Sequence, residues 1–155
     1  MSLDEGYLDL TGALAFLPTL EEQIAFARRI AHEIKTRTRV EIGLTCSIGI
    51  GYSMTSAKLA SEERKPDGYF EILTPEDFVS LILYRDVSVL YGVGKQTAMK
   101  LKAEGINTVM DVQNNRSKVL RLLGNKTGTY VTKPELMLAR CTANLTIRSR
   151  VRLWD

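Results

Sequence analysis

The spacing of apolar residues changes near residue 80, and this change constrains the fold more than any other feature of the sequence. Before that point, runs of β-branched residues alternate with segments in which apolar residues recur every three or four positions. From about Arg85 onward, the apolar segments are short, of helical type and punctuated by glycine. The pattern predicts an α+β layer over residues 1–80, a small all-helical region over residues 81–145 and a basic tail over residues 146–155.

Local signals place the elements of the first part. Strands are expected where β-branched and aromatic residues gather, at 3–10, 40–50 and 69–73. Thr19 and Glu22 have the spacing of a capping box, which predicts a helix from Leu20. Shorter helices are expected at 56–63 and after Thr74. The segment Lys65-Pro66-Asp67-Gly68 predicts a turn, in which proline presets φ and glycine permits a positive φ.

The second part is expected to consist of short helices joined by turns. The helical segments are 87–91, 95–104, 109–114, 117–123 and 135–141. Residues 125–131 are ambiguous, because their threonines and glycine oppose a helix. The tail over residues 146–155 is expected to be extended.

Charge divides the chain in nearly the same place. The net charge is −3 over residues 1–75 and +6 over residues 76–155. A basic segment after an acidic one is typical of a nucleic-acid interface beside a metal or substrate region, although lysines that merely solubilise helices give the same count. With two cysteines and one histidine, a Cys/His zinc site is excluded. No apolar run approaches a membrane span and no signal peptide is recognised, so a cytoplasmic protein is expected.

A glycine-rich hairpin lies within the basic region. Such a turn lets a partner approach the backbone, and the N–H groups of the helix that follows favour an anion there. The hairpin resembles the helix-hairpin-helix motif, which binds the sugar-phosphate backbone without reading the base sequence. The candidate DNA-binding residues are Gly92, Val93, Gly94, Lys95, Gln96 and Thr97. An ordinary pair of packed helices with an exposed lysine is the alternative.

Acidic residues begin the chain, at Asp4, Glu5 and Asp9. Side chains alternate along a strand, so Glu5 and Asp9 should share one face and Asp4 should lie on the other. Taken alone, the pattern favours solvated surface acids over a metal site.

Five motifs in order give these acids another meaning. The segment Ser2–Thr11 is similar to the S-x-D-E-x-Y-L-D-x-T strand of the Y-family (translesion) DNA polymerases. The segments 43–51, 57–61 with 65–68, the glycine hairpin and 147–152 resemble the next palm strand, the A-K-[IL]-A-S and K-P-x-G elements, the thumb and the R-x-R-V-R linker of that family. The resemblance implies an α+β fold: a partial polymerase palm, with an antiparallel or mixed sheet and helices on one face, followed by a helix-hairpin-helix thumb.

The resemblance also implies specific roles. Asp4 and Glu5 match the carboxylates that bind two Mg²⁺ ions, and Lys65 matches a lysine that contacts the triphosphate. Arg148, Arg150 and Arg152 match the arginines of the R-x-R-V-R linker, and are expected to contact DNA. The implied activity is addition of deoxynucleotides to a primer 3′ end during damage bypass, within the SOS response. The implied partners are primer–template DNA, a dNTP and, through regions outside this chain, a sliding clamp.

Two departures qualify the resemblance. Ser53 and Met54 stand where the family has Asn-Lys. The family's further metal-binding aspartate lies on an earlier strand, so we expect this chain to be a palm–thumb fragment that is inactive alone. A non-catalytic helix-hairpin-helix DNA-binding module is the alternative. Another palm-type enzyme, such as a nucleotidyl cyclase, would leave the hairpin and the arginine tail unexplained.

Overall fold

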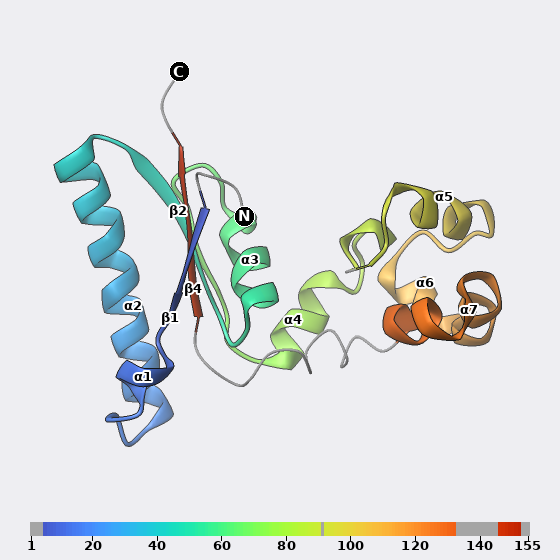
Figure 1. Cartoon of the computed structure of the whole chain (residues 1–155), viewed down its shortest axis with the longest axis horizontal. Coiled ribbons are helices and arrows are strands. Elements are labelled where there is room, and N and C mark those ends of the chain that lie inside the picture. The colour runs from blue at the N-terminus through green and yellow to red at the C-terminus, as the bar shows by residue number, and fades with distance from the viewer. Residues whose placement is uncertain (1–4, 91, 133–145, 153–155) are drawn as a thin grey trace. The chain divides into compact units, whose positions relative to one another are not determined.

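The computed structural model describes residues 5–90, 92–132 and 146–152 (Figure 1). The chain divides into two compact units, Met1–Thr74 with Cys141–Asp155, and Pro75–Arg140. This division falls slightly before the change of pattern near residue 80, because helix α4 (Pro75–Ile82) belongs to the second unit.

The first unit is built on a mixed four-stranded sheet. Its strands are β1 (Glu5–Asp9), β2 (Thr45–Gly51), β3 (Tyr69–Ile72) and β4 (Thr146–Arg152), in the order β1-β4-β2-β3 (Figure 1). Strand β3 is parallel to β2, whereas β4 is antiparallel to both of its neighbours. Strands β1, β2 and β3 therefore run in one direction and begin at the same end of the sheet. Of the two arrangements that the family resemblance implied, antiparallel or mixed, the sheet has the mixed one.

Strand β4 departs from the expectation of a linker over residues 146–155. Each of its residues from Thr146 to Arg152 has a partner on β2, and those from Thr146 to Arg150 also have partners on β1. The backbone N–H and C=O groups of a central strand bond to the neighbouring strands on both sides. In a free extended tail the same groups would bond to water. The basic segment is therefore an internal strand of the sheet.

Helix α2 (Leu20–Arg37) packs on one face of this sheet. It begins at the predicted capping box, in which Thr19 Oγ1 accepts a hydrogen bond from the Glu22 backbone N–H at 3.2 Å. Small side chains on α2 allow it to lie close to the even-numbered residues of β2. The buried core formed in this way comprises Leu10, Leu14, Ala27, Ala31, Cys46, Ile48 and Ile50.

Helix α3 (Met54–Glu63) lies on the opposite face of the sheet (Figure 1). There the odd-numbered residues of β2 include Gly49, where a Cβ atom would stand 2.2 Å from the backbone nitrogen of Ser61. The missing side chains let the helix backbone rest directly on the strand. The expectation of helices on one face only is therefore wrong. Along β2, isoleucine and glycine alternate, so that the isoleucines pack against α2 and the glycines against α3.

The segment before β2 also differs from its prediction. Residues Thr38–Ile42 form a π-helical turn, and β2 begins only at Thr45. Val40 and Ile42 are 78% and 65% exposed. Their β-branched side chains continued the apolar run of the strand, but Gly43, with φ +75°, separates them from it. A short helix, α1 (Thr11–Leu14), follows β1.

The second unit is helical in its described part. After α4 it contains the 3₁₀ turn η2 (Val87–Val89), α5 (Lys95–Ala103), α6 (Val109–Asn114) and α7 (Arg116–Thr132). Helix α7 breaks at Gly124 (φ 73°) and resumes, so the ambiguous residues 125–131 are helical. The expected helix at 135–141 lies outside the described residues. Among those described, no helix is long and apolar enough to cross a membrane.

Candidate functional site

One end of the sheet gathers most of the candidate residues of the first unit. Glu5 of β1 is the register partner of Arg150, and Arg150 is the register partner of Ser47 on β2. The Ser47 hydroxyl accepts a hydrogen bond from the Gly68 N–H at 3.3 Å. Since neighbouring strands lie about 4.8 Å apart, the Cα atoms of Glu5 and Ser47 are about 10 Å apart. The start of β1 and the turn that contains Lys65 thus lie at the same end.

Of the two candidate metal ligands, Glu5 is the one that the structure describes. It is half-buried at the first position of β1. Asp4 lies outside the described residues, so the expectation that it occupies the other face of the strand stays a prediction.

Asp9 forms a turn at the far end of the same strand. Its Oδ1 accepts hydrogen bonds from the Thr11 hydroxyl and, at 2.9 Å, from the Thr11 N–H. These bonds to Thr11 lower the pKa of the Asp9 carboxyl. The Asp-x-Thr pair therefore ends β1 and starts α1, a structural role that leaves the carboxylate engaged.

Lys65 is held close to α3. Its side chain is 13% exposed, and its Nζ stands 2.5 Å from Glu62 Oε2. That contact is an ion pair whose alignment falls short of a hydrogen bond. A candidate triphosphate ligand is therefore masked by a neighbouring carboxylate, which the sequence pattern did not reveal.

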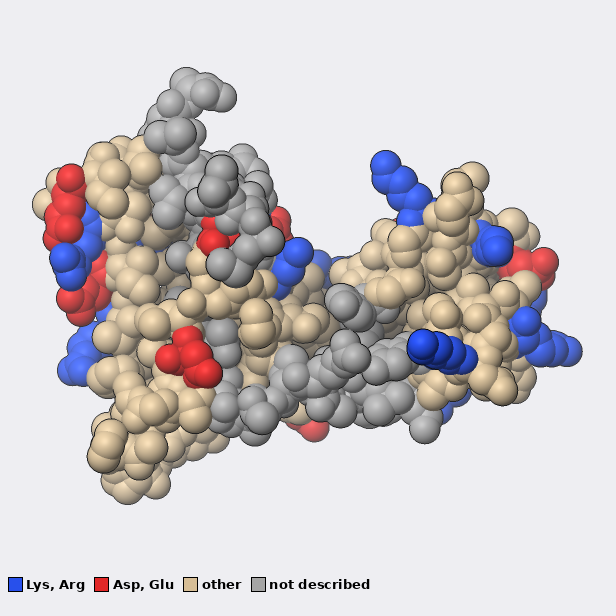
Figure 2. Space-filling view, viewed as in Figure 1, with Lys and Arg blue, Asp and Glu red and all other residues tan. Residues whose placement is uncertain are grey.

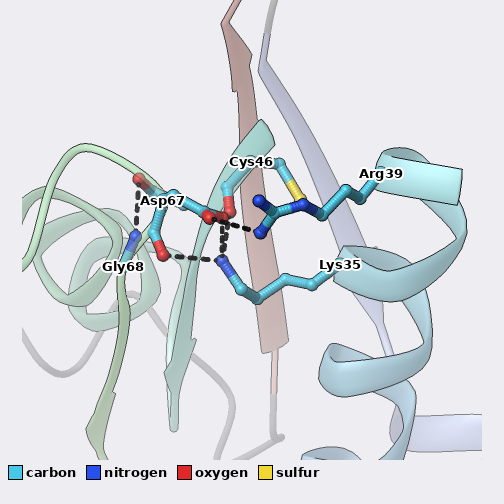
Figure 3. A network of polar contacts seen from close by, with 6 residues as sticks. Lys35, Arg39, Cys46, Asp67 and Gly68 are labelled. Carbon is cyan, nitrogen blue, oxygen red and sulfur yellow. Dashed lines mark hydrogen bonds and ion pairs between the residues drawn. The ribbon is translucent and has the colours of Figure 1, made fainter. Parts of the chain in front are cut away.

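The turn after Lys65 is fixed by a network of polar contacts (Figure 3). Lys35 on α2 donates to the Cys46 carbonyl oxygen at 2.7 Å, to the Asp67 carbonyl oxygen at 2.8 Å and to Asp67 Oδ1 at 2.5 Å. The backbone of Gly68 joins β2 by accepting from the Ile48 N–H at 3.0 Å. The turn therefore belongs rigidly to the sheet and to α2.

The conformation of this turn corrects one detail of the prediction. The positive φ is at Asp67 (51°) and the Lys65–Pro66 peptide is cis. Glycine is needed at position 68 for lack of space, because a Cβ atom there would stand 1.6 Å from the Arg64 carbonyl oxygen.

Ser53, one of the two departures from the family pattern, caps helix α3. Its hydroxyl accepts from the Ser56 N–H at 3.1 Å, and the Ser56 hydroxyl accepts from the Ser53 N–H at 2.9 Å. Both serines are buried. A small hydroxyl thus starts the helix that rests on β2, while Met54 is exposed.

The glycine hairpin lies in the second unit, between η2 and α5. Gly92 has φ +84°, and Val93 is buried as its apolar anchor. Gly94 is the N-cap of α5 and no side chain caps that helix. Gly92, Gly94, Lys95 and Gln96 are exposed and Thr97 is half-buried. The hairpin therefore presents backbone N–H groups and one cation to solvent, an arrangement that favours an anion.

Cations of the second unit fall into two groups. Lys102 pairs with Asp86 at 2.6 Å, holding the pKa of Asp86 at about 2, and Lys118 pairs with Glu104 at 2.9 Å. Lysine and arginine side chains stand out from the surface of this unit (Figure 2). Within the described part of the unit, four exposed cations have neither an ion pair nor a hydrogen bond: Lys95, Lys100, Arg121 and Lys126.

The three arginines of the tail have their backbone inside the sheet. Arg150 lies between Glu5 and Ser47, and Arg148 lies between Tyr7 and Gly49. Arg152 is the register partner of Thr45. Arg148 and Arg150 therefore lie beside the candidate carboxylate strand β1, whereas Arg152 is paired with β2 alone. The hairpin candidates are in the second unit.

The carboxylate oxygens at this end of the sheet are of the kind that binds a divalent cation. Carboxylate oxygens are the ligands that Mg²⁺ prefers, and Glu5 supplies them at the end of the sheet. Among the described residues, no group of three or more His, Cys, Asp or Glu side chains could hold a metal ion. The described residues thus fit Mg²⁺ in chemistry but supply only part of a coordination sphere.

Comparison with known proteins places the chain in a family. Residues 1–62 match the model of the impB/mucB/samB family, and curated proteins about 40% identical to this chain cover more than four-fifths of it. The chain therefore belongs to the Y-family of DNA polymerases.

The curated relatives carry a more particular name. A protein named DNA polymerase IV from Halorhodospira halophila is 40% identical over 130 residues, which are 83% of this chain and 34% of the relative. Another DNA polymerase IV, from Leptospira interrogans, is 41% identical over 133 residues, which are 86% of this chain and 34% of the relative. The chain thus spans about a third of the length of these relatives.

Proposed function

We propose that this chain carries part of the palm and the thumb of a translesion DNA polymerase that extends a primer 3′ end. The observation that carries the proposal is that β1, β2 and β3 begin at the same end of the sheet, so that Glu5 and the turn that contains Lys65 lie at that end. The chain that shows this arrangement is related to polymerases. Because the chain spans about a third of its relatives, we propose that activity belongs to a longer polypeptide and that this chain alone is inactive.

Asp4 and Glu5 are the proposed ligands of Mg²⁺. When bound, two such ions would activate the primer hydroxyl and neutralise charge on the triphosphate. Glu5 reaches the site from a strand whose ladder to β4 fixes its position. Further ligands have to come from outside the described residues, since these hold no three-member cluster.

Lys65 is the proposed triphosphate ligand. A flexible ammonium group suits a polyphosphate as a point charge. Its ion pair with Glu62 implies that nucleotide binding exchanges one carboxylate for phosphate oxygens. The chain's own contribution to this step is to hold and orient the lysine on a turn that is tied to the sheet.

The second unit is proposed to bind duplex DNA through the sugar-phosphate backbone of the DNA. The uncapped start of α5 and the exposed Lys95 face solvent together, and three further cations of the unit are unpaired in its described part. Such a surface binds phosphate without reading sequence, with an affinity that falls as salt is raised. Arg148, Arg150 and Arg152 are proposed to add to DNA binding from the first unit.

A chimera tests the proposal. The matching segment of the Halorhodospira halophila relative is replaced by this chain, and primer extension is measured with Mg²⁺ and dNTPs. We expect template-directed synthesis that Asp4→Ala or Glu5→Ala abolishes, whereas Glu21→Ala on α2 leaves it intact. A folded but inactive chimera contradicts the proposal. Incorporation by the 155-residue chain alone contradicts its proposed inactivity.

A non-catalytic DNA-binding module remains the second candidate, favoured by the hairpin and the unpaired cations. It predicts duplex binding by this chain that Glu5→Ala leaves unchanged, together with an inactive chimera. Catalytic and binding readouts on the same Glu5 variant therefore separate the two candidates.

A further inference from the structure

Lys35 of α2 makes more hydrogen bonds than any other cation described in the first unit. Its side chain is 20% exposed, and its ammonium group has three acceptors on two segments, β2 and the turn before β3. Lys35 carries three N–H donors, so each has an acceptor. This lysine therefore has no donor left for a phosphate.

Asp67 explains why such a clamp is needed. Its φ of 51° lies in the left-handed region that residues other than glycine seldom adopt. Lys35 grips this residue twice, through the carbonyl and the carboxylate, and Arg39 adds a longer contact of 3.6 Å to Oδ2 (Figure 3). A backbone conformation of this kind persists where its surroundings over-determine it.

The turn in turn carries Lys65, two residues before Asp67. On one side Gly68 is tied to Ser47 and Ile48 of β2, and on the other Lys65 contacts Glu62 of α3. Loss of the contacts between Lys35 and Asp67 would therefore free the backbone that directly follows Lys65. Lys35 therefore holds the Lys65–Gly68 turn in place without itself contacting a ligand.

We infer that Lys35 is a positioning residue, whose ammonium group pins the Lys65–Gly68 turn to α2 and β2 and thereby sets where Lys65 meets a nucleoside triphosphate. The inference rests on the proposed role of Lys65. Lys35 binds no substrate in this scheme.

The experiment uses the 155-residue chain with Lys35→Met, which keeps an apolar stem, and Lys35→Arg, which restores the charge. Arg28→Met is the matched control, because Arg28 also joins α2 to the sheet region, through Glu71 of β3, but does not touch the turn. Amide hydrogen exchange at Gly68 and Ile48 reports the turn, and titration with Mg·dATP followed by NMR reports triphosphate binding.

We expect exchange at both amides to be about tenfold faster or more in Lys35→Met than in the control, with partial rescue by Lys35→Arg. Binding of Mg·dATP should weaken by a similar factor in Lys35→Met alone. Equal exchange in Lys35→Met and Arg28→Met overturns the inference, because the lysine is then merely structural. Faster exchange with unchanged affinity overturns its link to the triphosphate. If the wild-type chain shows no Mg·dATP shifts at residues 65–68, the role of Lys65 fails, and exchange alone decides whether Lys35 holds the turn.

Discussion

Gly49 of β2 lies directly against Ala57 of α3, and a Cβ atom at Gly49 would stand 2.3 Å from the Ala57 carbonyl oxygen. The distance is far below any real Cβ contact, and the nearest atoms belong to helix backbone, which cannot swing aside. The fit of α3 on the sheet therefore depends on the absence of a side chain at this position.

Substitution of Gly49 should be severe. We expect Gly49→Ala to lower the free energy of unfolding by about 3 kcal/mol, within the range for overpacked cores. Urea unfolding followed by circular dichroism measures the change. Gly12→Ala is the control, since Gly12 has open space around its Cβ position, and it should be nearly neutral. A similar small effect at both glycines would show that α3 can move away.

The glycine hairpin should determine duplex binding. We expect Lys95→Glu to weaken binding of a DNA duplex at low salt by about tenfold and to flatten its dependence on salt. Fluorescence anisotropy at several salt concentrations measures both. Arg29→Glu makes the same change of net charge on α2 of the other unit and should have little effect. An unchanged affinity for Lys95→Glu would remove the hairpin from the interface.

The ion pair between Lys65 and Glu62 should compete with nucleotide. Glu62→Gln removes the carboxylate charge 2.5 Å from Nζ, so we expect Mg·dATP to bind two- to fivefold more tightly, about the worth of a partly exposed ion pair. NMR titration of the chain measures the dissociation constant, with Glu63→Gln as the neighbouring control. Weaker binding in Glu62→Gln would mean that Glu62 helps to present the lysine.

At acid pH, Glu71 should no longer contribute to the free energy of unfolding. Arg28 donates two hydrogen bonds of 2.8 Å to this carboxylate and Tyr69 donates another, which lowers the pKa of Glu71 despite partial burial. The unfolded chain then takes up the proton more readily, so the stabilisation is present above the unfolded pKa and is lost as pH falls through the folded one.

The measurement is urea unfolding of the wild type and of Glu71→Gln between about pH 7 and pH 3. The gap in unfolding free energy should be largest at neutral pH and shrink with acid. The exposed Arg37–Glu41 pair is the control, because Glu41→Gln should open a smaller gap. A gap for Glu71 that does not vary with pH contradicts the prediction.

A proline in β4 should disrupt the first unit. Ser149 lies opposite both Gly6 and Ile48, so Ser149→Pro removes a ladder donor from a central strand. We expect a loss of about 3 kcal/mol or more, measured by urea unfolding, while Ser149→Ala changes stability little. A mild effect of proline would show that the strand is dispensable.

Local signals predicted the elements that local interactions form. The capping box at Thr19 and Glu22 predicted the start of α2 correctly, because both residues lie within one helical turn. The start of β2 was misplaced, since Val40 and Ile42 look buried in a linear pattern and only Gly43 reverses the chain. The pairing of β4 with β1 and β2 depends on segments about 100 residues or more apart, which no local pattern encodes.

The candidate site divides in the same way. Motif order located Glu5, Lys65 and the hairpin along the chain. Lys35 and Glu62 were missed, because a lysine on a helix and a glutamate near its end look solvated until the turn folds onto them. Residue spacing alone does not indicate that Lys35 bonds to the interior of the fold and not to solvent.

The place of β4 in the sheet has a consequence for biosynthesis. The strand that separates β1 from β2 is the last of the four to leave the ribosome, after the whole second unit. Until residues 146–152 emerge, β1 has no partner among the described strands, and both it and β2 expose an unpaired edge. The helical unit can fold early from local contacts, whereas the sheet can close only late, during a period when a nascent chain is open to pairing with other strands.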